Sequence, residues 1–157
     1  LGQNIDVVAR IFDETMLALR QCAALELSRE PICCAVSAHH GLAAKDRLAV
    51  EDLYGERLML IKRGWSRSVD RLREDLWKNH PQIQIVDFDF YNTEAFNQCE
   101  NNNCVLMAMD YWRYVHPLMK ILPVEWDHTI PFGLFHAPAP SPGVERFLKA
   151  VEKVVRS

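Results

Sequence analysis

The sequence predicts an α/β fold in which short buried strands alternate with amphipathic helices. Apolar runs that are too short for helices recur along the chain, as at residues 32–37, 58–61 and 104–109. Apolar residues at helical spacing lie between these runs, most clearly at residues 66–78. The 157 residues, of which 49% are hydrophobic and 25% charged, are enough for one globular domain with its own core. Such alternation predicts a mostly parallel sheet.

The first third of the chain is predicted to hold three strands and one short helical turn. Ile5 to Ile11 is a short apolar segment that indicates a buried strand. A second strand covers Ile32 to Ser37, and Pro31 marks its start. Val50 to Tyr54 is expected to form a single helical turn, and Leu58 to Ile61 a third strand.

The middle of the chain is predicted to continue with a helix and a strand. Ser66 to Lys78 has apolar residues on one helical face, and the Asn-His-Pro sequence at residues 79–81 stops the helix. Ile83 to Phe90 follows as a strand. Its alternation of apolar residues changes phase, which predicts a bulge or bend near Val86.

The rest of the chain repeats this pattern. A short helix is expected at Thr93 to Glu100, with Asn92 or Thr93 as its cap. Further strands are expected at residues 104–109, 120–124 and 130–136. Ser141 then caps a last helix, which begins with a proline and carries an apolar stripe at five positions: Val144, Phe147, Leu148, Val151 and Val155.

Composition narrows the classes of function. The net charge of -3 gives no sign of a general binder of nucleic acids or membrane surfaces. No apolar run approaches the ~20 residues of a membrane span, and the first residues lack the pattern of a signal peptide. Five cysteines, an odd number, argue against a secreted disulfide framework. A cytoplasmic protein with no membrane segment is therefore expected, in which Cys33 and Cys34 are buried thiols.

The sequence does not favour a metal site, a thiol switch or a catalytic carboxylate pair. The six histidines lack the spacing of a metal site, so neither a metal nor a cofactor is expected. Cys99 and Cys104 are close enough in sequence for a thiol switch, although ordinary packing is favoured. Asp87 and Asp89 alternate along a strand and so share one face. Paired carboxylates could carry out acid–base catalysis, and the alternative is that they are solvated or cap a helix. Solvation is favoured, and no catalytic residue is expected.

Two strand-to-helix turns are the best candidates for a ligand site. In open α/β sheets, ligands bind outside the carboxyl ends of the strands, so both turns are expected on the same edge. The first turn is basic and begins a helix, whose N–H groups attract anions. The alternative interpretation of the first turn is an ordinary solvated loop in which the serine caps the helix. The residues of the two turns are Arg63, Gly64, Trp65, Ser66 and Arg67, and Phe90, Tyr91, Asn92 and Thr93.

An ordered series of segments covers nearly the whole chain: Ile5-Asp6-Val7-Val8, His40-Gly41-Leu42-Ala43, Val50 to Glu56, Cys99 to Met109 and Pro138 to Phe147. As a series, these segments resemble the effector-binding domain of LysR-type transcription regulators. Gly41 stands where the family has proline in His-Pro-Leu-Ala. Asn102, Asn103 and Asp110 replace family glycines and a proline.

The resemblance implies a periplasmic-binding-protein-like (type 2) fold of two α/β subdomains with a ligand cleft between them. Residues 31–122 would form the second subdomain, and residues 1–30 and 123–157 an incomplete first one. The family's helix-turn-helix DNA-binding domain would lie outside this chain. Members of the LysR-type family act as homo-oligomers, and their sensing domain binds a small, often anionic, effector. There are two alternatives. The chain could be a solute-binding protein, or an enzyme that uses Asp87 or Asp89 on the same α/β scaffold.

Overall fold

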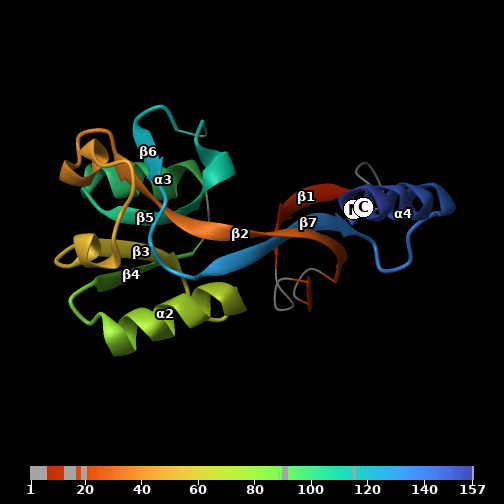
Figure 1. The fold of residues 1–157 in the computed structure, drawn as a ribbon, viewed down its shortest axis with the longest axis horizontal. Helices are drawn as coiled ribbons and strands as arrows, with labels where there is room; N and C mark the ends of the chain where they lie inside the picture. Colours follow the sequence, from red (N-terminus) through yellow and green to blue (C-terminus); the bar gives the residue numbers. More distant parts are fainter. Residues whose placement is uncertain (1–6, 13–16, 19–20, 90–91, 115, 157) are drawn as a thin grey trace. The chain divides into compact units, whose positions relative to one another are not determined.

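The computed structural model describes residues 7–12, 17–18, 21–89, 92–114 and 116–156 (Figure 1). Helices and strands alternate over much of this part of the chain, which confirms the predicted α/β class. In order, they are β1 (Val8–Ile11), β2 (Ala23–Ser37), η1 (Gly41–Ala44), η2 (Val50–Leu53), β3 (Arg57–Ile61), α2 (Arg67–Asn79), β4 (Gln84–Phe88), α3 (Thr93–Asn101), β5 (Val105–Met109), η3 (Asp110–Trp112), β6 (Met119–Leu122), β7 (Thr129–His136) and α4 (Pro142–Val155).

The chain divides into two compact units. Unit 1 comprises Leu1–Glu30 with Ile130–Ser157, and unit 2 comprises Pro31–Thr129. The expected second boundary followed Leu122, whereas the observed one follows Thr129. Residues 123–129 belong to unit 2 because they hydrogen-bond within it. The N–H of Ile32, for example, donates to the carbonyl of His128 at 2.9 Å.

The sheet of unit 2 is mixed, so the prediction of a mostly parallel sheet is wrong. Its strands follow the order β2-β5-β3-β4, with β6 paired to β2. β3 is parallel to both β4 and β5, but β2 is antiparallel to both β5 and β6. β3, β4 and β5 are parallel because the helices α2 and α3 join them, and strands joined through a helix return in the same direction. The η1 and η2 segments, rather than an α-helix, join β2 to β3.

β4 contains no bulge, contrary to the prediction. It pairs with β3 in an unbroken parallel register from Arg57↔Gln84 to Ile61↔Phe88. The change of phase in the sequence has another cause. Ile85 and Val86 point to opposite faces, and both are half-buried, so this strand packs apolar side chains on each side.

β2 begins at Ala23, well before its predicted start, and Pro31 lies inside it. The register explains why the proline is tolerated. Ile32 pairs with Met109, the last residue of β5, so Pro31 lies one position beyond that partner strand. No ladder hydrogen bond is lost where the proline lacks its N–H.

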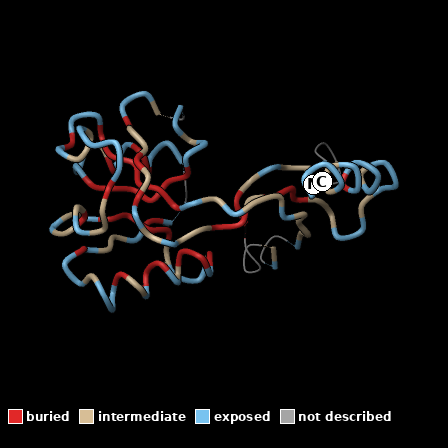
Figure 2. The backbone as a smooth tube through the Cα atoms, in the orientation of Figure 1, coloured by how far each residue is buried: buried red, intermediate tan, exposed pale blue. Residues whose placement is uncertain are grey.

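The core of unit 2 is formed by β3, β5, the second half of β2 and the inner face of α2 (Figure 2). All five residues of β5 are buried. The predicted apolar face of α2 is confirmed, since Val69, Leu72 and Leu76 are at most 1% exposed. Burying each such side chain stabilises the fold by about 1.5–3 kcal/mol.

Unit 1 contains β1, β7, the first half of β2 and α4. β1 pairs antiparallel with β7. α4 begins at Pro142 and is capped by Ser141, as predicted. Its apolar stripe is less covered than expected, because Leu148 is buried whereas Phe147 is 50% exposed.

Candidate functional site

The two predicted turns leave the same edge of the unit 2 sheet. β3 and β4 are parallel neighbours, and Ile61 pairs with Phe88 at their carboxyl ends. The N–H of Lys62 donates to the carbonyl of Phe88 at 2.9 Å, where the two turns begin. Phe90 and Tyr91 lie outside the described residues. The described parts of the turns are therefore held side by side at the edge where ligands bind in open α/β sheets.

The first turn is closed by a carboxylate of the helix that follows it. Gly64 has φ +95°, a left-handed conformation that favours glycine. Its N–H points to the carboxylate of Asp70, at 3.2 Å from Oδ2. Asp70 lies in the first turn of α2, where a negative charge also interacts favourably with the helix dipole.

Ser66 is the N-cap of α2, as the sequence suggested. Its Oγ accepts a hydrogen bond from the N–H of Val69 at 3.3 Å. The whole residue is buried, with 0% of its surface exposed. Its hydroxyl therefore stabilises the helix start from inside the protein. A ligand at this turn would contact the more accessible groups around it.

The basic groups of the first turn have acidic or aromatic neighbours. Arg63 forms an ion pair with Glu74 at 3.1 Å. Lys62 lies 3.6 Å from Asp89 of the second turn and over the ring of Trp65 at 5.4 Å. The positive charge of this edge is thus partly balanced, and less of it is available to an anion than the sequence alone indicated.

In the second turn, Asn92 is the cap of α3. Its Oδ1 accepts a hydrogen bond from the N–H of Ala95 at 3.0 Å. Thr93 is the first residue of the helix and is exposed. The choice between Asn92 and Thr93 left by the sequence is thereby settled.

Sequence reasoning missed a third segment at this edge. β5 is parallel to β3, so the η3 turn that follows β5 leaves the sheet in the same direction as the other two turns. It presents Tyr111 and Trp112, whose rings meet edge to face at 5.8 Å. The rule about carboxyl ends of strands, applied to residues 104–109, would have identified it.

Arg73 was missed as well. It lies on the buried face of α2, and its Nη1 is 2.6 Å from Oδ1 of Asp87. Its Nη2 donates to the carbonyl of Ile61 at 2.8 Å. An arginine at helical spacing from Val69 and Leu76, on the mostly apolar face of the helix, was the available signal.

The acid–base alternative has no support at Asp87 and Asp89. Their side chains are 60% and 72% exposed, and each is paired with a cation, Arg73 or Lys62. Paired catalytic carboxylates are typically found in a closed site that perturbs their proton affinity. These two face water at the rim of the sheet.

The histidines whose contacts are described take structural roles. His40 Nδ1 accepts the N–H of Leu42 at 3.0 Å, and its Nε2 lies 3.1 Å from Glu56. His116 repeats this arrangement, with its Nδ1 accepting the N–H of Leu118 at 3.2 Å. Across the described residues, no three His, Cys, Asp or Glu side chains are placed to hold a metal ion.

The five cysteines are free thiols. Cys33 and Cys34 are buried on β2, as predicted. The Sγ of Cys99 donates to the carbonyl of Cys104 at 3.1 Å. Burial raises the pKa of Cys99 to about 12 and that of Cys34 further still. Buried thiols of this kind are poor nucleophiles at neutral pH.

A scan against protein families matches residues 1–156 to the LysR substrate binding domain. The chain belongs to this family. The predicted family and fold are thereby confirmed, and the chain is a ligand-sensing regulatory domain of the LysR type. No curated protein sequence matches it significantly. In the described part of this LysR domain, no helix is long and apolar enough to cross a membrane.

Solved structures share the fold at low sequence identity. The regulatory domain of CcmR from Synechocystis PCC6803, in complex with 2-PG, is 12% identical with a TM-score of 0.62; the match covers 96% of this chain and 73% of that one. The BenM effector-binding domain with benzoate is 14% identical with a TM-score of 0.63, covering 96% and 69%. The LysR-family regulator CbnR is 16% identical with a TM-score of 0.70, covering 98% and 53%. These similarities support the periplasmic-binding-protein-like type 2 fold.

Proposed function

We propose that this LysR domain senses a small carboxylate at the carboxyl edge of the unit 2 sheet. The observation that carries the proposal is the pairing of Ile61 with Phe88, which aligns two strand-to-helix turns at that edge. Two fold neighbours, the effector-binding domains of QuiR and BenM, hold the carboxylates shikimate and benzoate, respectively. Both compounds combine one anionic group with a ring, a chemistry that suits a basic turn beside aromatic side chains.

In this proposal, the carboxylate lies at the start of α2 and the ring of the ligand lies against aromatic side chains. Arg67, the exposed first residue of α2, supplies the guanidinium. The first turn of a helix carries N–H groups without partners inside the helix, and these attract an anion. Trp65 lies within this turn and Tyr111 follows β5 at the same edge, so both are placed near the ligand's ring. The described residues of the second turn, Asn92 and Thr93, would complete the site.

The proposed role is regulatory and not enzymatic. Asp87 and Asp89 are exposed and ion-paired, so neither supports acid–base chemistry. The family match also favours a regulator over a solute-binding protein. Ligand binding would shift populations between states of the regulator in the cytoplasm and thereby alter DNA binding by a helix-turn-helix domain. The acidic chain itself, with net charge -3, has no general affinity for DNA in this account.

We also propose that the domain self-associates. The half-exposed Phe147 and Val155 of α4 leave apolar surface in unit 1 that a second copy could bury. Sedimentation of the protein over a range of concentrations tests this. A dimer is expected, and a monomer at high concentration would contradict it.

The ligand site is tested by calorimetric titration of benzoate and shikimate. Arg67→Ala should weaken binding of whichever compound the wild type binds by about tenfold or more, because a hydrogen bond to a charged group contributes about 1.5–3 kcal/mol. Ser66→Ala should also weaken binding, because it loosens the helix start. Arg71→Ala, at an exposed position of the same helix, and Ser141→Ala, at the cap of α4, are the matched controls. Equal affinity in wild type and both site variants would refute this placement of the site.

A further inference from the structure

Arg73 joins the three elements that carry the two turns. It lies on α2, directly after the first turn in the chain. Its Nη2 donates to the carbonyl of Ile61, the last residue of β3, at 2.8 Å. Its Nη1 lies 2.6 Å from the carboxylate of Asp87, the residue before the last in β4. One side chain thus holds both strand ends from which the turns begin.

Arg73 forms this link from the buried face of α2, and its bond to Ile61 is buried whereas its bond to Asp87 is partly exposed. Its side chain is 9% exposed, whereas that of Asp87 is 60% exposed. The Nε atom of Arg73 is buried and has no hydrogen-bond partner among the described residues. A buried donor without an acceptor destabilises the folded state, because it has lost its hydrogen bond to water.

The ion pair adds little to stability, because water screens a pair whose carboxylate is exposed. Stability alone therefore does not account for the arginine. The neighbouring positions Val69, Leu72 and Leu76 on the same face are apolar and wholly buried. The distinguishing property of Arg73 is its two directed bonds, which fix the end of β3 relative to the end of β4.

We propose that Arg73 is a positioning residue for the ligand site: it holds Lys62, where the first turn begins, in place relative to Asp89, where the second turn begins. This inference rests on the proposed function, because it gives these turns a shared purpose. Arg73 acts through Ile61 and Asp87 and is not itself placed against the ligand. The hydrogen bond from the N–H of Lys62 to the carbonyl of Phe88 joins the same strand ends.

The first test is amide hydrogen exchange in the ligand-free protein. Arg73→Met removes both bonds while keeping a long apolar side chain. It should raise exchange by at least about tenfold at Lys62 and Gly64 and also at Ala95, because the N–H groups of these residues are hydrogen-bonded within the two turns. Arg73→Lys, which keeps the charge and one donor, should recover part of the protection.

Two further variants separate positioning from general loss of stability. Asp87→Ala removes only the bond to β4, so exchange should rise at Ala95 but stay near wild type at Gly64. Leu76→Ala truncates the core face of the same helix and should not act selectively on the turns. The inference is overturned if Arg73→Met affects the turns no more than Leu76→Ala does, or if Asp87→Ala loosens both turns equally.

Binding of benzoate and shikimate gives the second readout. Arg73→Met should bind the compound that the wild type binds at least about tenfold more weakly. Leu76→Ala should bind it with wild-type affinity. If the wild type binds neither compound, the proposed function fails, while the exchange pattern still decides whether Arg73 positions the turns. If the wild type binds and Arg73→Met binds equally well, the inference fails although the proposed function stands.

Discussion

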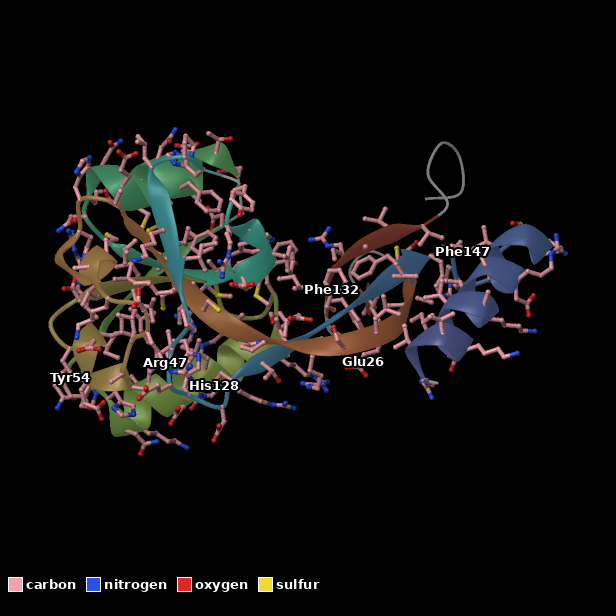
Figure 3. The ribbon with its side chains drawn as sticks, turned by 45° about the horizontal axis from the view of Figure 1, so that its top comes forward. Glu26, Arg47, Tyr54, His128, Phe132 and Phe147 are labelled. Carbon is pink, nitrogen blue, oxygen red and sulfur yellow. The ribbon has the colours of Figure 1, made fainter. Side chains whose placement is uncertain are left out.

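The Nε2 atom of His128 lies 2.8 Å from Oδ2 of Asp75. This contact joins His128, which precedes β7 and is labelled in Figure 3, to the helix α2 within unit 2. Asp75 also accepts a hydrogen bond from Asn79, one turn further along the helix, at 2.7 Å. The chain is thereby fixed to unit 2 one residue before the boundary that follows Thr129.

The hydrogen bond from His128, followed by that from Asn79, lowers the pKa of Asp75 below the ordinary value of 3.8. A lowered pKa means that the folded state prefers the ionised carboxylate. The resulting stabilisation is present above pH 3.8 and is lost as the pH falls through the lowered pKa. Asp75→Asn should therefore reduce the free energy of unfolding at pH 5–7, relative to wild type, and this difference should shrink as the pH falls below 3.8.

Urea denaturation of both proteins across this range measures the effect. The exposed Asp46→Asn is the control, and it should show no comparable change with pH. A difference between wild type and Asp75→Asn that stays constant from pH 7 to strong acid would contradict the assigned role of the ionised carboxylate.

Gly133 marks a close approach of two strands in unit 1. A Cβ atom at this position would lie 2.1 Å from the backbone carbonyl oxygen of Leu25. Gly133→Ala should therefore destabilise the protein strongly, by about 3 kcal/mol or more, since backbone must move. Gly143→Ala is the matched control in α4, where the nearest atom lies 3.9 Å away. Thermal unfolding of both variants is the measurement, and similar melting temperatures would show that the close approach is wrong.

The buried thiols are expected to resist modification. Because burial raises the pKa values of Cys34 and Cys99, almost no thiolate is present at neutral pH. Iodoacetamide at pH 7.5, followed by mass spectrometry, should leave both residues unmodified in the folded protein and alkylate them in urea. Mild peroxide should leave Cys99 and Cys104 as thiols. A disulfide between them that changes the fold would instead favour a redox sensor.

The sequence was sufficient to predict the parts of the fold that depend on local patterns. The apolar face of α2, the cap at Ser66 and the proline start of α4 were all correct. The direction of β2 was not predictable in this way. Strand direction depends on which strands pair, and the pairing of Ile32 with Met109 joins residues far apart in the chain.

The site was predictable only in outline. Alternation of strands and helices placed two turns after neighbouring strands, but their charge balance required the structure. Arg63 and Glu74 are eleven positions apart, and their contact follows from the geometry of the turn and not from helical spacing. The link from Arg73 to Asp87 likewise depends on how α2 packs on the sheet.

Mapping of ligand contacts by NMR tests the central claim most directly. Benzoate and shikimate are titrated into the ¹⁵N-labelled protein while the amide shifts are followed. The account predicts saturable changes at residues 62–67 and at Asp89, Asn92 and Thr93, at the carboxyl ends of β3 and β4. Glu56 and Gln84, at the opposite ends of these strands, should not respond. Saturable shifts confined to those opposite ends or to unit 1, or no saturable shift with either compound, would contradict the account.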